Sequence, residues 1–211
     1  MVLKKLGIAD EIELAHEEER MSKLAALGLY RDGTLDALAP GTFSALRDIH
    51  AALFGDIYGF AGRVRAVNVS KGSFRFASAL YLDAAIRSVE AMPQGSFDEI
   101  AEKYVEMNIV HPFREGNGRA GRIWLDHMFR CGLGLAVDWS CIGCEDYLLA
   151  MQRSPVRDLE IKVLLRQAPS DDLQGVELIA RSIDASWSYE GFGTYRAEDL
   201  SGDLPEQQYA R

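Results

Sequence analysis

The sequence has few cysteines, and it lacks long apolar runs, internal repeats and low-complexity tracts. The three cysteines, Cys131, Cys141 and Cys144, are odd in number and have no second Cys/His pair, so neither a disulfide framework nor a zinc site is expected. No apolar stretch is long enough to span a bilayer, and the N-terminal segment lacks the apolar core of a signal peptide. We therefore expect a cytoplasmic protein with no membrane partner.

An excess of positive charge is also lacking. The 211 residues carry a formal net charge of −9, which argues against direct nucleic-acid binding because such binding needs a basic surface. Apolar residues make up 48% of the chain, enough for a substantial core. No Pro- or Ser-rich linker divides the sequence. We expect a single domain over residues 1–195, followed by a flexible polar tail over residues 196–211.

Apolar residues recur at helical spacing over most of the chain. Helices are predicted over residues 8–27, 43–57, 79–91, 96–110, 142–153, 156–167 and 173–190, with one more between about residues 119 and 131. Ser96 and Glu99 form a capping box for one of them. The expected fold class is therefore all-α.

Residues 63–76 depart from this pattern. Residues 63–69 and 73–76 alternate with period two around Lys71-Gly72, which predicts a short β-hairpin that must lean on the helices. Its exposed edge could receive an extended peptide by strand addition. A connecting hairpin without a partner explains the pattern alone at least as well.

The chemistry is concentrated in residues 111–122, a loop that feeds a helix. Gly116-Asn117-Gly118 permits a sharp turn that presents successive backbone N–H groups, and the first turn of the helix adds its own unpaired N–H groups. Arg119 and Arg122 share one face of that turn, where positive charge opposes the helix dipole. A polyphosphate would explain both arginines, since the guanidinium fork matches phosphate oxygens. The loop therefore predicts an anion-binding nest.

Two further groups stand beside the nest. Glu115 could hold Mg²⁺ between its carboxylate and the phosphates. His111 has a side chain that titrates near neutrality, which suits a general base acting on an alcohol. A lone histidine at a helix end, a Gly-Asn-Gly turn and an arginine pair each have an ordinary structural explanation. Their coincidence in one loop predicts a nucleotide phosphate site with a base at its rim.

This stretch is similar to the signature of the Fic family, His-x-Phe-x-Asp/Glu-Gly-Asn-Gly-Arg-x-x-Arg. Every specified position is filled: His111, Phe113, Glu115, Gly116, Asn117, Gly118, Arg119 and Arg122. The resemblance extends over most of residues 40–190 and includes the hairpin, which looks like the target-docking flap of the family. It implies an all-α Fic-fold bundle with this flap beside the active-site loop.

The resemblance also implies an activity, the transfer of AMP from Mg-ATP to a Ser, Thr or Tyr hydroxyl of a target protein. His111 would deprotonate the acceptor, Glu115 would hold Mg²⁺, and Phe113 would anchor the loop. Asn117 and the amides of Gly116 and Gly118 would hold the α-phosphate. The remaining residues implied in ATP binding are the two phosphate-clamping arginines and two flap residues: Arg119, Arg122, Lys71 and Phe74.

A second motif lies near the C-terminus. Ser186-Trp187-Ser188-Tyr189-Glu190-Gly191 resembles the inhibitory pattern of the family, Ser/Thr-x-x-x-Glu-Gly/Asn, in the single-domain class with a C-terminal inhibitory helix (class III). It implies that Glu190 bonds Arg122 and blocks the productive γ-phosphate position, with Ser186 fixing the helix. Members of this class are often restrained further as homo-oligomers and released by self-modification of tyrosines. Tyr189 and Tyr195 are the candidates here.

Two other functions stay open at this point. The first is a nucleotide-binding regulatory module with little activity, against which the intact His111 and Glu115 argue. The second is the reverse reaction, removal of AMP from a modified protein, with Glu190 positioning water. The target is expected to dock on residues 63–76, and toxin-like relatives suggest a type II topoisomerase subunit.

Overall fold

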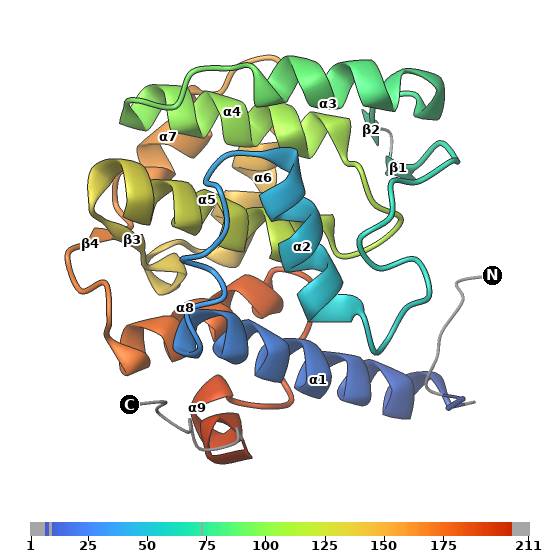
Figure 1. Cartoon of the computed structure of the whole chain (residues 1–211), viewed down its shortest axis with the longest axis vertical. Coiled ribbons are helices and arrows are strands. Elements are labelled where there is room, and N and C mark those ends of the chain that lie inside the picture. The colour runs from blue at the N-terminus through green and yellow to red at the C-terminus, as the bar shows by residue number, and fades with distance from the viewer. Residues whose placement is uncertain (1–6, 9, 73, 204–211) are drawn as a thin grey trace.

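The computed structural model describes residues 7–8, 10–72 and 74–203. Its body is mostly helical (Figure 1). The helices are α1 (Glu11–Arg31), α2 (Phe43–Phe54), α3 (Leu82–Glu90), α4 (Phe97–Val110), α5 (Asn117–Leu133), α6 (Cys144–Arg153), α7 (Leu159–Leu165), α8 (Val176–Ser188) and α9 (Ala197–Leu200). Two antiparallel pairs of two-residue strands complete it: β1 (Ser70–Lys71) with β2 (Phe74–Arg75), and β3 (Ala136–Val137) with β4 (Pro169–Ser170).

Helix α5 is the central element. In Figure 1, α3 and α4 lie along one side of the molecule, α1 lies along the other, and α5 runs between them. Every residue from Arg119 to Phe129 is buried, because α5 packs against α4, α2 and α8 at once. A glycine in left-handed conformation bounds each end of the helix, Gly116 before it and Gly134 after it. The loop 111–116 is thereby fixed at the edge of the core.

The predicted helices are present, with shifted bounds. Helix α1 continues through Gly28 to Arg31, and the carboxylate of Asp10 caps its start. At the start of α4 the hydroxyl of Ser96 accepts the N–H of Glu99, as predicted. The carboxylate of Glu99 accepts the N–H of Gly95, one residue earlier than a capping box requires.

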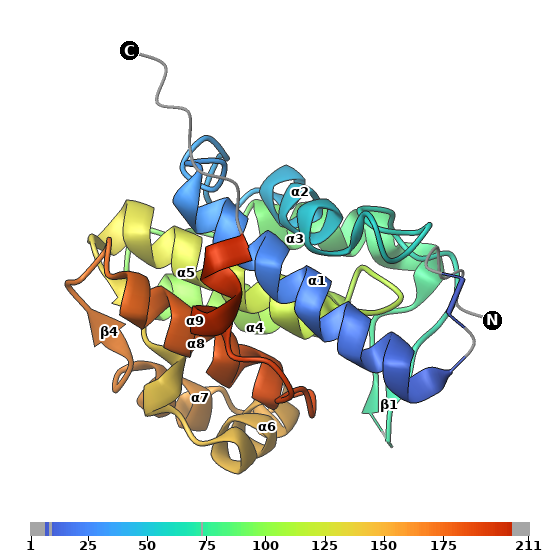
Figure 2. The same cartoon turned by 90° about the horizontal axis from the view of Figure 1, so that it is seen from below.

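The predicted strand over residues 63–69 is wrong. The hairpin has only two residue pairs, Ser70 with Arg75 and Lys71 with Phe74, and it projects from the body (Figure 2). In the preceding segment Arg65 is buried while Val64 and Val67 are exposed, the reverse of a half-buried strand. The reason is that the Arg65 guanidinium donates to main-chain carbonyls, those of Val67, Ala77, Val110 and His111.

The chain after α8 contains one more short helix. Ala197 and Leu200 of α9 are buried where α9 packs against α1 and α8. Residues 197–203 therefore form a short helix and a 3-10 turn in the region where the sequence predicts a flexible tail. The rest of the predicted tail, residues 204–211, lies outside the described residues. Within the described ranges, no helix combines the length and the apolar character needed to cross a membrane.

Candidate active site

His111 ends α4 and begins the loop. Its backbone is left-handed, with φ 51°, and no other described non-glycine residue has a positive φ. The imidazole stacks on Phe76 of the flap at 3.6 Å between ring centroids, and its Nδ1 lies 3.2 Å from the carbonyl oxygen of Asn108. An Nδ1–H that donates to this carbonyl leaves Nε2 with a free lone pair. Burial lowers the pKa of His111 to about 4, so the ring is neutral and able to accept a proton near pH 7.

The side chain of Asn117 closes the loop. Its Oδ1 accepts the N–H of Phe113 and its Nδ2 donates to the carbonyl of Phe113, both at 2.9 Å. Both polar ends of this amide are therefore bonded to the loop itself. The side chain was predicted to contact the α-phosphate, and here it shapes the turn that would do so.

A second histidine supports the loop from below. His50 of α2 is fully buried and stacks on Phe113 at 3.8 Å between centroids. Its Nδ1 accepts the N–H of Gly62, so Nε2 carries the proton and donates to the carbonyl of Glu115 at 2.8 Å. Burial lowers the pKa of His50 to about 4, which keeps it neutral. Sequence reasoning missed this residue, because one histidine on an apolar helix face carries no distinctive signal.

Two glycines of the nest are required by close contacts. Gly116 has φ 77°, and a Cβ there would lie 2.4 Å from the ring of Phe54. A Cβ at Gly118 would lie 2.3 Å from Oε1 of Glu190. The first contact seals the loop onto the core. The second shows that a carboxylate already lies against the first turn of α5, at the place predicted for an anion.

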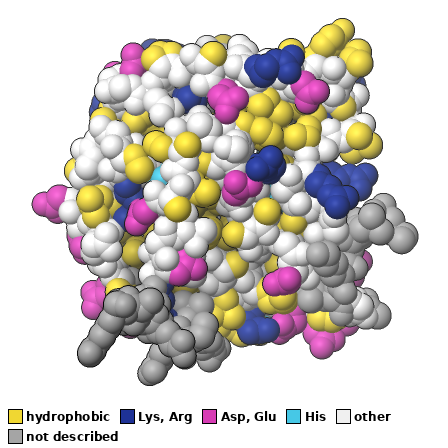
Figure 3. All heavy atoms as spheres, in the orientation of Figure 1, with side chains coloured by type: hydrophobic (Ala, Val, Ile, Leu, Met, Phe, Trp, Pro, Cys, Tyr) yellow, Lys and Arg dark blue, Asp and Glu magenta, His cyan; other side chains and the backbone are white. Residues whose placement is uncertain are grey.

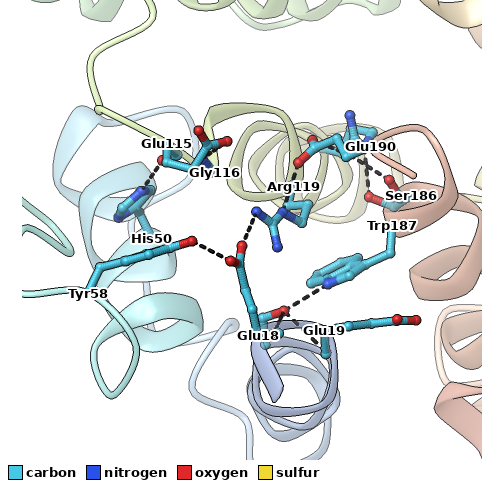
Figure 4. A network of polar contacts seen from close by, with 12 residues as sticks. Glu18, Glu19, His50, Tyr58, Glu115, Gly116, Arg119, Ser186, Trp187 and Glu190 are labelled. Carbon is cyan, nitrogen blue, oxygen red and sulfur yellow. Dashed lines mark hydrogen bonds and ion pairs between the residues drawn. The ribbon is translucent and has the colours of Figure 1, made fainter. Parts of the chain in front are cut away.

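Glu190 pairs with both predicted phosphate-clamping arginines, and Figure 4 shows its pair with Arg119. Its Oε2 lies 2.9 Å from Nε of Arg119, and its Oε1 lies 2.9 Å from Nη2 of Arg122. Both guanidinium groups are almost fully buried. Burial of Glu190 by itself would raise its pKa, but the two arginines outweigh that effect and hold the pKa below its ordinary value. The group is therefore an ionised carboxylate at neutral pH.

Ser186 fixes the other side of Arg122. The Ser186 hydroxyl accepts from Nε of Arg122, and its carbonyl accepts from Nη2, both at 2.6 Å. The rings of Tyr147 and Tyr189 lie beside the same guanidinium. The structure thus brings together the three residues of the predicted inhibitory contact. Glu190 lies two residues beyond the end of α8 rather than within the helix.

A second buried carboxylate, Glu18 of α1, was missed. Its Oε1 accepts from Nη2 of Arg119 at 2.8 Å, and its Oε2 accepts a short hydrogen bond from the hydroxyl of Tyr58. Arg119 is therefore held between two carboxylates from opposite ends of the chain (Figure 4). In the sequence Glu18 stands among other glutamates and looks like part of a solvated helix face.

These groups line one cleft of about 1080 Å³. Lys71 and Phe74 of the flap form one wall together with His111, and residues of α6 form another. Of the predicted site residues, those lining the cleft are Lys71, Phe74, His111, Glu115, Gly116, Asn117, Gly118, Arg119, Arg122 and Glu190. A space of this size can hold a nucleotide and part of a peptide.

The predicted metal ligand is a single carboxylate. Glu115 is exposed beside the nest, and no group of three His, Cys, Asp or Glu side chains able to hold a metal exists among the described residues. One carboxylate is too few for a preformed metal cage. It fits Mg²⁺, which takes one or two protein carboxylates and fills its other positions with substrate phosphates and water.

The two tyrosines predicted as modification sites differ in exposure. Tyr189 is buried, and its hydroxyl donates to the carbonyls of Trp139 and Ile142. Tyr195 is half-buried and has its main chain held by Glu19 and Lys23 of α1. In this conformation Tyr189 is the less accessible of the two.

Comparison with known proteins identifies relatives along most of the chain. The family model described as Fic/DOC family matches residues 40–129. "Probable protein adenylyltransferase Fic" of Salmonella typhimurium is 30% identical over 79% of this chain and 86% of its own length. "Probable protein adenylyltransferase y4lH" of Sinorhizobium fredii is 32% identical over 74% and 83%, respectively. "Protein adenylyltransferase VbhT" of Bartonella schoenbuchensis is 28% identical over 89% of this chain, which spans 43% of that relative's length.

Solved structures share the fold at lower identity. The BepC protein of Bartonella tribocorum with bound AMPPNP has a TM-score of 0.64 at 19% identity, covering 79% of this chain and 91% of that one. An N-terminal Fic domain of a putative cell filamentation protein of Bartonella quintana with bound ADP has a TM-score of 0.65 at 20% identity, covering 81% and 92%.

Proposed function

This chain belongs to the Fic/DOC family, and on that premise we propose that it is a protein adenylyltransferase whose active site is closed by its own Glu190. The family and the mostly helical Fic fold predicted from the sequence are confirmed. The names of the relatives support AMP transfer. The observation that carries the restraint is the Glu190 carboxylate, which lies against Gly118 and pairs with Arg119 and Arg122.

In the proposed reaction the hydroxyl oxygen of a target Ser, Thr or Tyr attacks the α-phosphorus of ATP. A new O–P bond forms while the bond from the α-phosphorus to the pyrophosphate oxygen breaks, and pyrophosphate leaves. The hydroxyl proton passes to Nε2 of His111, whose Nδ1 is occupied by Asn108. The lowered pKa of His111 keeps it ready to accept a proton, and its stacking on Phe76 fixes the ring plane.

The remaining residues bind and orient the nucleotide. The main-chain amides of Gly116 and Gly118 would stabilise the α-phosphate, and Arg119 and Arg122 would bind the outer phosphates. Mg²⁺ bound with ATP supplies neutralising charge, and Glu115 is the side chain placed to hold it. Such a site accelerates the transfer mainly by positioning and electrostatic stabilisation.

Glu190 competes directly with the phosphates. A carboxylate and a phosphate cannot both take the same guanidinium groups at the start of α5, since the two anions would repel each other at contact distance. Productive binding of ATP therefore requires Glu190 to leave two buried arginines. Apparent affinity falls in proportion to the fraction of molecules in the open state.

Replacing Glu190 tests this proposal. With ATP labelled at the α-phosphate, Glu190→Gly should raise labelling of the chain itself and of lysate proteins at least about tenfold, as expected if the closed state dominates. Glu177→Gly, which removes an exposed glutamate at the start of α8 and outside the cleft, is the matched control and should equal the wild type. ATP labelled at the γ-phosphate should give no label. Equal or lower labelling by Glu190→Gly than by the wild type contradicts the restraint.

Further details stay predictions. Of the two candidate acceptors for self-modification, we favour Tyr195. The hydroxyl of Tyr189 is buried and already hydrogen-bonded to the main-chain carbonyls of Trp139 and Ile142. A homo-oligomer and a type II topoisomerase target remain expectations carried by the family. Mass spectrometry of lysate treated with the Glu190→Gly form would identify both the target and the modified residue.

A further inference from the structure

The flap carries a charge bias that the proposed function does not use. Residues 57–82 contain four basic residues and no acidic one, although the chain as a whole has 32 acidic and 23 basic residues. The guanidinium of Arg65 is buried and donates hydrogen bonds to main-chain carbonyls. The other three, Arg63, Lys71 and Arg75, are exposed.

Together with exposed Arg114 of the loop, these residues form what we call the cationic rim: Arg63, Lys71, Arg75 and Arg114. None of the four side chains makes an ion pair or a hydrogen bond with a described residue. Among other exposed arginines, Arg153 and Arg166 each pair with a carboxylate, whereas Arg157 has no such pair among the described residues. Lys71 acts electrostatically on Glu190, so Arg63, Arg75 and Arg114 carry the positive charge that has no carboxylate contact among the described residues.

Two of the four rim residues line the cleft, and Arg75 pairs with Ser70 in the hairpin that also carries Lys71. Lys71 and Arg114 line the cleft, whereas Arg63 and Arg75 are not among its lining residues. Figure 3 shows Lys and Arg side chains on the side of the molecule where Figure 1 has β1 and β2. The phosphates of ATP at the start of α5 would account for Lys71 at most. They leave Arg63 and Arg75, outside the cleft, without a partner.

A target segment would supply that partner. A hydroxyl that reaches His111 brings its neighbouring residues past Lys71 and Arg114, which line the same cleft, and toward the hairpin that carries Arg75. Strand addition to the flap would give main-chain hydrogen bonds that carry little side-chain information. We infer that the target presents acidic residues beside its acceptor hydroxyl, and that the cationic rim reads them. This inference rests on the proposed function.

Charge at such a rim acts chiefly on encounter and selection. Unlike charges across an interface raise the association rate, like charges reject the wrong partner, and both effects weaken as salt screens them. The net charge of −9 on the whole chain makes the rim the exception on an acidic protein. It would therefore draw an acidic segment to the cleft rather than to the surface at large.

Peptides of one length can test the inference on the full-chain Glu190→Gly form. Each peptide carries one central Ser, Thr or Tyr, flanked by Glu, by Lys, or by neutral residues that have no hydroxyl group. Transfer of label from α-labelled ATP should be fastest with Glu flanks, with kcat/KM at least about tenfold above that for Lys flanks at low salt. Added NaCl should reduce this ratio.

Charge reversal gives the matched comparison. Arg63→Glu and Arg75→Glu should abolish or invert the preference for acidic flanks while leaving ATP binding unchanged. Arg157→Glu reverses an equally exposed cation between α6 and α7, and should keep the preference. Circular dichroism checks that each variant is folded.

The outcomes separate the two proposals. Labelling of the chain itself but of no peptide, equal kcat/KM for all flanks, or a preference that survives both flap reversals would each overturn the inference while leaving the proposed function intact. A complete lack of labelling, of chain and peptides alike, would overturn the proposed function and the inference with it.

Discussion

The loop from His111 to Gly118 and the flap around β1 and β2 face the same cleft but are held in different ways. The loop is cross-bonded, with the Asn117 amide on both main-chain groups of Phe113 and His50 beneath it. The flap has a ladder of two residue pairs, and the segment leading into it is held by one buried arginine, Arg65. A local motif therefore encodes the shape of the loop. The flap is instead shaped by tertiary contacts at the base of the flap.

The largest effect is expected at the start of the loop. In the Glu190→Gly background, His111→Ala should lower AMP transfer by about 10²- to 10⁴-fold, because no base remains to take the acceptor proton. ATP binding, measured by calorimetry, should change little, since the nest and arginines are untouched. Transfer retained at the parental rate would show that another group is the base.

Replacing Arg65 tests the contacts that hold the base of the flap without changing the loop. Arg65→Gln should lower the free energy of unfolding by about 3 kcal/mol, because it leaves buried carbonyls without their charged donor. Arg63→Gln, two residues earlier and exposed, should stay within about 0.5 kcal/mol of the wild type. Urea denaturation measures both variants. Similar midpoints for the two would mean that Arg65 does not hold the flap.

The pH dependence of transfer should distinguish a buried base from an ordinary one. A histidine acts as a base when neutral, and the lowered pKa of about 4 keeps His111 neutral down to pH 5. A histidine with the ordinary pKa of about 6.5 would lose roughly thirtyfold of its base form at that pH. We expect kcat/KM of the Glu190→Gly form to change less than about twofold between pH 7 and pH 5. A fall of kcat/KM with a midpoint near pH 6.5 would contradict this expectation.

The smallest effect concerns a third histidine, His127. Unlike His50, it is buried without hydrogen bonds to its ring nitrogens among the described residues. His127 lies on α5 and is fully buried. His127→Leu should raise the free energy of unfolding by about 1 kcal/mol at pH 7, because it removes an unsatisfied polar group. His50→Leu should lower it instead, since it breaks the bonds to Gly62 and Glu115.

The gain from His127→Leu should grow as the pH falls. Burial lowers the pKa of His127 in the folded protein, so below about pH 6.5 the unfolded chain takes up a proton that the folded protein does not. The wild type loses stability in that range and the leucine variant is spared this loss. Urea midpoints at pH 7 and pH 5 test it, and a gain independent of pH would contradict the assignment.

Much of the site could be predicted because its signals are local. The Ser96 cap, the glycines of the nest and the spacing of Arg119 and Arg122 are written within a few turns of chain. Glu18 could not be predicted in the same way. It resembles its exposed neighbours, and only the packing of α1 beside the site turns it into a partner of Arg119.

The same limit explains why the predicted strand over residues 63–69 is wrong and why α9 is not predicted. Alternation over residues 63–69 predicts a strand when charged residues are assumed to face solvent, and Arg65 violates that assumption by bonding carbonyls from distant segments. The polar composition after residue 196 hides Ala197 and Leu200, two apolar residues that suffice to dock a short helix. The average composition of a segment does not reveal two apolar residues on one helix face, although the packing of the helix depends on them.

The contact at Gly118 has a consequence for how this protein can evolve. A single methyl group there would collide with Glu190, and it would also occupy the space proposed for phosphate. A side chain at Gly118 is thus no route to an unrestrained enzyme, because it would disturb the inhibitory contact and the proposed phosphate site together. Gain-of-activity alleles should arise at Ser186, at Glu190 or at Glu19, which holds the main chain of Thr194 and Tyr195. Loss-of-activity alleles should gather between His111 and Arg122, so a genetic map would separate the two classes along the chain.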